Sequence, residues 1–278
     1  MSGVGSAAAR ARRGAGVAGA FVRMGVRATF SYPLGFAFFV FGELLSVVSF
    51  LFLGHYLRAS PAIGPSYLSF ASIGLVSSQV VLAGILGLGV ELDAAVQQGR
   101  MEMLLIEPVS WRVLPAGLAV WPVVYRVSAA LLVFLSAWAL GARFRLSGFP
   151  ISIVLVLLAA AAGVAVGILA GSVRILSKRA DPVAILYALA ASLLAGSFVP
   201  LNDFPAPLRV LAWVLPTTYL NAGLRKALLA HSAGIYGPSP AAAVVLLGSF
   251  VAVVLPFSLW LFGRSVEAGR RLGVLAGY

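Results

Sequence analysis

The sequence predicts an all-α integral membrane protein with six membrane-spanning helices. Hydrophobic residues make up 61% of the 278 residues, whereas charged residues make up only 10%. A soluble domain carries charge on about a quarter of its residues. The apolar residues also fall into six runs that are about as long as a bilayer core is thick, ~30 Å at 1.5 Å per residue. We therefore treat residues 1–278 as one transmembrane domain.

The net charge of +12 comes almost wholly from arginine. A strongly basic chain can bind nucleic acid, but here the arginines stand beside apolar spans. Membrane topology and anionic lipid headgroups explain that placement better. The sequence therefore predicts the lipid bilayer as a partner, and no nucleic acid.

Residues 1–31 are small and basic. Apolar residues recur at helical spacing from Val17 to Ala28, with arginines on the other faces. This pattern predicts an amphipathic helix on the cytoplasmic membrane surface, preceded by a disordered leader as far as Arg13. A signal peptide fits poorly, because the apolar run is short, is broken by Arg23 and has no clear cleavage site.

The six predicted spans are each near the length that a bilayer requires, and the fifth is at the short limit. They lie at Tyr32–Gly54, Tyr67–Val90, Ala116–Leu140, Ile151–Val173, Val183–Val199 and Ala241–Phe262.

An even number of spans places both termini on one side of the membrane. If the N-terminus is cytoplasmic, the inner segments carry thirteen Lys or Arg residues and the outer loops carry six. The positive-inside rule then places both termini in the cytoplasm of a multi-pass protein of the cell membrane.

The outer segment 200–240 is long, apolar and interrupted by prolines, which break helices. Short helices are expected at Pro205–Leu215 and Thr217–Ala230. Apolar helices that are too short to span are best explained as re-entrant or interfacial. Their non-helical neighbours must then be buried in protein or line a cavity.

The segment 91–115, between the second and third spans, is the longest polar interruption. From Glu91 to Glu107 the pattern predicts an amphipathic helix that exposes Leu104 and Leu105 beside its apolar stripe and that Pro108 ends. Two interpretations stay open: a linker helix resting on the membrane, or a docking helix for a soluble partner. The segment holds four of the chain's eight acidic residues: Glu91, Asp93, Glu102 and Glu107.

Two charges are expected inside spans, Glu43 in the first and Arg126 in the third. Such charges are costly in a bilayer, so they usually face the bundle and pair with one another. A structural Glu43–Arg126 ion pair and a Glu43 that faces a substrate path are both open. Gln79 in the second span is a further polar position, suited to a pore contact or an interhelical hydrogen bond.

Several kinds of chemistry are missing from the sequence. No Gly-Lys dipeptide occurs, so the chain has no P-loop for ATP, and it has neither an HExxH nor a GxSxG motif. Cysteine is absent, and the isolated His55 and His231 do not form a metal-ligand cluster. We therefore expect no enzymatic site on this chain.

Three stretches resemble type-2 ABC exporter permeases. Gly99–Ser110, with the sequence Gly-Arg-Met-Glu-Met-Leu-Leu-Ile-Glu-Pro-Val-Ser, resembles the signature that this family carries between spans two and three. Ser197–Pro205 resembles its small-Phe-x-Pro segment after span five, and Leu215–Tyr219 followed by Arg225 resembles its Pro-x-x-Tyr…Arg element. The resemblance covers almost the whole chain in the same order.

The chain departs from the family pattern at two positions. Glu107 stands where many relatives have a basic residue, and Asn221 stands where many have an acidic one. The first departure bears on the pairing with a partner, and the second bears on contacts in the outer gate.

The resemblance implies a half-transporter. Two permease subunits, identical or similar, would meet two copies of a separate P-loop ATPase, which would bind ATP and Mg²⁺, so that this chain itself holds no cofactor. It implies ATPase-coupling residues: Glu91, Asp93, Gly99, Glu102, Leu104, Leu105, Glu107 and Pro108. It implies outer-gate residues: Phe198, Pro200, Pro216, Tyr219, Asn221 and Arg225.

Two other functions compete with this one. A stand-alone secondary carrier would use Glu43 as its proton-coupled group, and a membrane scaffold subunit would transport nothing itself. The substrate of an exporter (a drug, a lipid or a polysaccharide) is not set by the sequence, nor is the choice between a homodimer and a heterodimer.

Overall fold

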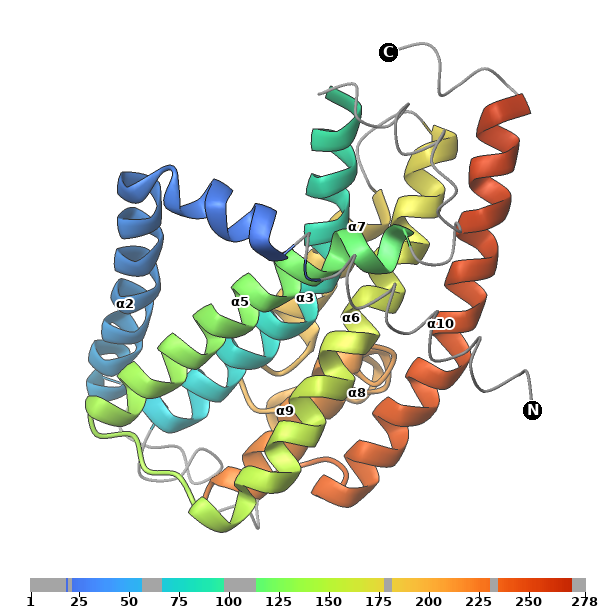
Figure 1. Cartoon of the computed structure of the whole chain (residues 1–278). Helices are drawn as coiled ribbons and strands as arrows, with labels where there is room; N and C mark the ends of the chain where they lie inside the picture. Colours follow the sequence, from blue (N-terminus) through green and yellow to red (C-terminus); the bar gives the residue numbers. More distant parts are fainter. Residues whose placement is uncertain are drawn as a thin grey trace, which may run out of the picture.

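The structure is a computed structural model, and it describes residues 19, 22–56, 67–97, 114–177, 182–230 and 235–271. Within these ranges every regular element is a helix and there is no strand. Figure 1 shows long helices in a bundle, with short helices among them. The all-α prediction is confirmed for this part of the chain.

Five described helices are long and apolar enough to cross a membrane. At ~1.5 Å per residue even the shortest, α2, exceeds the ~30 Å of a bilayer core. The protein is therefore membrane-embedded, as predicted. The five helices are α2 (Pro33–Tyr56), α3 (Tyr67–Gln97), α5 (Leu114–Ala139), α6 (Phe149–Ser177) and α10 (Pro240–Arg271).

The predicted fifth span is not a full-length helix. α7 runs only from Pro182 to Leu194, 13 residues, which is ~20 Å at 1.5 Å per residue. Gly196 follows with a φ of +69°, in the left-handed region that glycine adopts readily. The chain stays apolar to Val199, which is why hydropathy alone predicts a longer helix. Where six spans were predicted, the described residues thus give five helices long enough to span and the shorter α7.

The ends of two other spans also differ from the prediction. α3 continues without a break from Val90 to Gln97, so the start of the predicted polar segment belongs to the same helix as the span. α10 continues nine residues beyond the predicted Phe262, to Arg271. In both helices polar residues extend the helix beyond its apolar part.

The long helices alternate in direction from α2 to α6, whereas α10 runs the same way as α6. In Figure 1, α2 and α5 run toward the bottom of the picture, and α3, α6 and α10 run toward the top. α9 (Pro216–Leu228) reaches the lower end, where the Arg145 amide between α5 and α6 donates to the Leu228 carbonyl. We call this end of the bundle the α9 end, and the other the opposite end. α3 lies centrally and packs against both α5 and α6, and α6 packs against α10.

Glycines bring α3 and α6 into close contact. A Cβ on Gly84 of α3 would overlap the α6 backbone at Gly163 and Val164. A Cβ on Gly167 of α6 would overlap the Gly84 carbonyl oxygen. Small residues at such a crossing let two backbones approach closely, which is how membrane helices gain packing contacts. The seam fixes α3 against α6 and leaves no room for a side chain between them.

Residues 22–30 are helical and lie across the opposite end, at a steep angle to α2 (Figure 1). Gly25 contacts the Trp121 ring on α5 so closely that a Cβ there would overlap it. The predicted N-terminal helix is thus present over these residues, while the leader lies outside the described residues.

Short helices follow α7, close to where they were predicted. They are the 3₁₀ turn η2 (Leu201–Asp203), α8 (Ala206–Ala212) and α9. Eleven of the thirteen α9 residues are buried, and its neighbours are α3, α6 and α10. A second 3₁₀ turn, η1 (Leu146–Gly148), leads into α6.

Candidate functional site

The candidate site is built around the 195–201 loop, the stretch between α7 and η2. Its backbone carbonyls have lost water, because Ala195, Ser197 and Leu201 are all buried. Buried carbonyls need hydrogen-bond donors from elsewhere in the protein. Two side chains of α9, Asn221 and Arg225, supply them.

Arg225 is 3% exposed and donates to three carbonyls. Its guanidinium nitrogens lie 2.5 Å from the oxygen of Gly196, 2.6 Å from that of Ser197 and 3.3 Å from that of Phe70 on α3. One planar cation therefore joins α3, α9 and the 195–201 loop, a task that suits the fixed fork of arginine.

The charge of Arg225 is balanced without a carboxylate among the described residues. The guanidinium carbon lies 3.4 Å from the centre of the Phe70 ring, a close cation–π contact. Burial lowers the pKa of the Arg225 guanidinium, because the charged form is removed from water. Its Nε has no hydrogen-bond partner among the described residues. Carbonyl dipoles and an aromatic face are what keep this cation inside the protein.

Asn221 holds the same loop one turn earlier on α9. Its Nδ2 donates to the Ala195 carbonyl, 3.0 Å, and to the Ser197 hydroxyl, 3.1 Å. The Ser197 hydroxyl also hydrogen-bonds that of Ser78 on α3, at 3.1 Å. At Gly74 of α3, a Cβ would overlap the Ser197 carbonyl oxygen. The loop is thus clamped between α9 and α3 by side chains and by direct backbone contact.

The other predicted outer-gate residues surround this clamp. The Phe198 carbonyl accepts from the Tyr67 hydroxyl at 3.3 Å, and the Phe198 ring stacks on Phe50 of α2 at 5.2 Å. Pro200 caps η2 with extended backbone, and Pro216 is the first residue of α9. The Tyr219 hydroxyl donates to the Trp213 carbonyl. All six predicted residues therefore fall in one region at the α9 end.

A second polar cluster lies between α2, α3 and α5. The Gln79 amide donates to Glu43 Oε2 at 2.6 Å, and an Arg126 guanidinium nitrogen lies 3.8 Å from Glu43 Oε1. Arg126 also lies over the Phe39 ring, 5.6 Å from its centre. The predicted Glu43–Arg126 pair is present, and Gln79 makes the interhelical hydrogen bond that was one of its two predicted roles.

A groove of about 360 Å³ runs along α3 and α5 beside this cluster. Apolar side chains dominate its lining, together with Gln79 and Arg126 from the polar cluster and Glu91 near the opposite end. The Arg126 side chain is 46% exposed, whereas that of Glu43 is 13% exposed. The arginine is thus the open member of the pair.

The predicted ATPase-coupling residues are only partly described. Glu91 and Asp93 lie in the last turns of α3, at the opposite end of the bundle from the clamp. The rest, Gly99, Glu102, Leu104, Leu105, Glu107 and Pro108, lie outside the described residues. The structure therefore leaves the predicted helix untested beyond Gln97.

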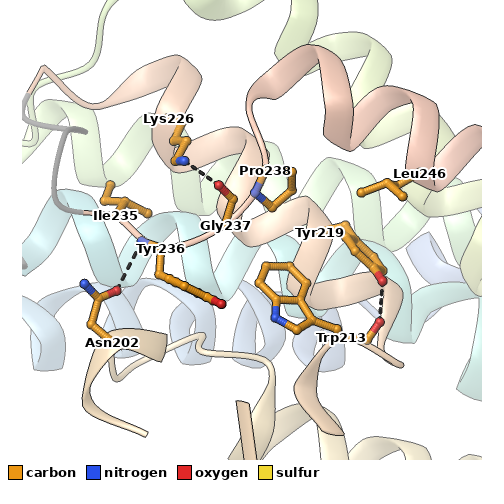
Figure 2. A pocket seen from close by; sticks show the side chains of 9 residues that line it. All are labelled: Asn202, Trp213, Tyr219, Lys226, Ile235, Tyr236, Gly237, Pro238 and Leu246. Atoms are coloured by element: carbon orange, nitrogen blue, oxygen red, sulfur yellow. Dashed lines mark hydrogen bonds between the residues drawn. The ribbon is translucent and has the colours of Figure 1, made fainter. Parts of the chain in front are cut away.

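A pocket of about 640 Å³ opens at the α9 end. Figure 2 shows three aromatic rings, Trp213, Tyr219 and Tyr236, with the Lys226 side chain above them. Sequence reasoning did not select Lys226, Trp213 or Tyr236 as site residues. The signal was present, since aromatic and basic residues concentrate in this loop, but their convergence depends on the fold.

Comparison with known protein families and with curated proteins gives no match for this chain.

Proposed function

We propose that this chain is the membrane-spanning subunit of an ATP-binding-cassette exporter of the type-2 class. In this proposal it forms the translocation path with a second permease subunit, identical or similar. Two copies of a separate ATPase bind ATP and Mg²⁺ and drive it from the cytoplasm. The chain itself is not an enzyme.

One observation carries the proposal more than any other. Two of the three family-like stretches, Ser197–Pro205 and Leu215–Arg225, are separated in sequence but joined in space by Asn221 and Arg225. Gly74 on α3 permits the close approach of the loop, because a Cβ there would overlap the Ser197 carbonyl oxygen, and the Asn221 amide and the Arg225 guanidinium satisfy the loop carbonyls.

The topology completes the proposal. α7 and the 195–201 loop together make the fifth crossing, and η2, α8 and α9 form the re-entrant outer gate. Irregular backbone at such depth requires satisfied polar groups, which the donors of α9 supply. Both termini then lie in the cytoplasm of the cell membrane, on the side of the opposite end.

α3 supplies a physical link between the ATPase and the gate. It is one helix from Tyr67 to Gln97; Glu91 stands at its cytoplasmic end, and Ser78 contacts the loop. These two residues are thirteen positions apart, ~20 Å along a helix. A displacement of the cytoplasmic end by the ATPase would move the contact with Ser197 as part of the same rigid element.

A secondary carrier is the competing function, because Glu43 is a carboxylate beside a groove. Its contacts speak for a structural role, since it accepts from Gln79 and pairs with Arg126. A carrier would need that carboxylate to exchange protons with water during transport.

The test is a mild-detergent pull-down of the tagged chain from native membranes, with mass spectrometry of the proteins that co-purify. The variant changes Leu104 and Leu105 to Asp. A matched control changes Leu146 to Asp, an exposed leucine at the α9 end. We expect a P-loop ATPase with the native chain and the control, and its loss with the variant.

If the chain purifies alone in all three samples, yet transports solute along a proton gradient in liposomes, the exporter proposal would be wrong and the secondary carrier would be supported. A second permease in the native sample would settle the pairing of subunits.

A further inference from the structure

The pocket at the α9 end carries an inference that does not rest on the exporter proposal, only on the placement of the chain in a membrane. We propose that this pocket binds the headgroup of an anionic phospholipid from the adjacent leaflet. The pocket holds about 640 Å³, enough for a headgroup and the start of its acyl chains.

The donors of the pocket suit a phosphate. The Lys226 ammonium donates to the Gly237 carbonyl, and an ammonium group has three N–H donors. The Trp213 indole N–H and the Tyr236 hydroxyl are further donors in the lining. Figure 2 shows Lys226 above the Gly237 backbone and Tyr236 below it, with Trp213 beside Tyr236.

The lining of the pocket carries a positive charge. Lys226 is the one charged side chain among its described lining residues. The Arg209 guanidinium lies over the Tyr236 ring, 5.3 Å from its centre. A lysine ammonium binds phosphate groups as a point charge, whichever leaflet carries the lipid. The charge therefore favours a net anionic lipid over a zwitterionic one.

The position of the pocket suits a lipid and not a small anion from solution. Leu246 lines it and is the seventh residue of α10, which begins at Pro240. Six residues of helix correspond to ~9 Å, so the pocket extends from the loop into membrane depth. Leu246 itself is 39% exposed and offers an apolar surface to an acyl chain.

The aromatic wall fits the same level of the membrane. Trp213 lies 5.3 Å from Tyr219 and 6.0 Å from Tyr236, measured between ring centres. Tryptophan and tyrosine collect where headgroups meet hydrocarbon, because their rings are apolar and their N–H and O–H groups are polar.

The experiment uses the full chain, purified in detergent and freed of lipid, with native mass spectrometry as the readout. The probes are dioctanoyl phosphatidylglycerol, dioctanoyl phosphatidylcholine and inorganic phosphate. We expect half-occupancy by phosphatidylglycerol at a concentration about tenfold below that for phosphatidylcholine, the size of one charge-assisted hydrogen bond. Inorganic phosphate should not displace the bound lipid.

The variant Lys226→Gln can still donate to Gly237 but lacks the charge, so it should lose the preference for phosphatidylglycerol. Lys226→Arg should keep it. The matched control is Arg145→Gln, which removes an exposed cation from the same end but outside the pocket. Tyr236→Leu, which leaves Lys226 intact, should weaken phosphatidylglycerol binding several-fold.

Equal binding of the two lipids by the native chain would overturn the proposal. So would an equal loss of preference in Lys226→Gln and Arg145→Gln, since that would indicate general surface charge. Displacement of phosphatidylglycerol by equimolar inorganic phosphate would overturn the proposal of a lipid site and would indicate a site for a soluble anion.

Discussion

Arg225 and Arg126 are both cations held among apolar helices, and they are held in opposite ways. Arg225 is buried, donates to three carbonyls and stacks on Phe70 at 3.4 Å. Arg126 is 46% exposed, and within the described ranges its one ion-pair contact, with Glu43, is 3.8 Å long. Arg225 is therefore held in a fixed contact, whereas Arg126 is free to change its contacts.

The surroundings of the two arginines follow the same division. Near Arg225, the backbone contact with Gly74 and the hydrogen bonds of Asn221 hold the 195–201 loop in a single position. Near Arg126, the groove between α3 and α5 leaves space for the side chain to move. We infer that α3, α9 and the loop act as one body, while the Arg126 side chain on α5 can rearrange in the groove beside it.

The largest expected effect is at Arg225. Arg225→Gln leaves several buried carbonyls unsatisfied, at ~1–3 kcal/mol each, so the free energy of unfolding should fall by about 3–5 kcal/mol. Arg225→Lys should not restore it, because an ammonium lacks the planar fork. Thermal unfolding of the purified variants measures both. A lysine variant as stable as the native protein would contradict this description of the joint.

Gly74 is expected to come next. Gly74→Ala forces a methyl group into the Ser197 carbonyl, and overpacking of this kind costs about 1–3 kcal/mol. The matched control is Gly42→Ala in α2, where nothing lies within 4 Å of the added Cβ. The control should gain up to ~1 kcal/mol, as alanine favours a helix over glycine. Equal unfolding midpoints for the two variants would show that the close approach does not matter.

Asn221→Ala removes two hydrogen bonds and leaves the Ala195 carbonyl without its donor. We expect a loss of about 1–2 kcal/mol in the free energy of unfolding, since one buried group becomes unsatisfied. Hydrogen exchange of the 195–201 loop amides should rise in the same variant. Unchanged hydrogen exchange together with an unchanged free energy of unfolding would show that Asn221 does not hold the loop.

The smallest effect on stability is expected at Glu43. Glu43→Gln keeps a partner for Gln79 and loses only a long, half-exposed ion pair, so the cost should be at most about 1 kcal/mol. We still expect lower assembly or transport, because Arg126 loses its counter-charge beside the groove. Normal expression with native transport would exclude both a structural and a pathway role for Glu43.

Much of this arrangement could be predicted from local sequence signals. Composition and run length predict the long helices, and Glu43 and Arg126 are recognisable as a pair because charges in spans seek partners. The residues predicted to form an outer gate were selected by their resemblance to a family pattern, and they lie together at the α9 end, while their role stays a prediction.

What the sequence could not predict depends on contacts between distant residues. The three acceptors of Arg225 are main-chain oxygens at positions 70, 196 and 197, and a carbonyl has no residue-type signature. The early end of α7 was missed because hydropathy continues to Val199 and cannot register the left-handed Gly196. The Gly74 approach is likewise invisible until α3 and the loop are placed together.

The most direct test of the clamp uses two introduced cysteines. The native chain has no cysteine, and the Ser78 and Ser197 hydroxyls lie 3.1 Å apart, so Ser78→Cys and Ser197→Cys form an isolated pair within disulfide reach. The measurement is the rate of disulfide formation in membranes, with and without Arg225→Gln. We predict rapid cross-linking that Arg225→Gln slows strongly. An equal rate in both backgrounds would contradict the claim that Arg225 fastens the loop to α3.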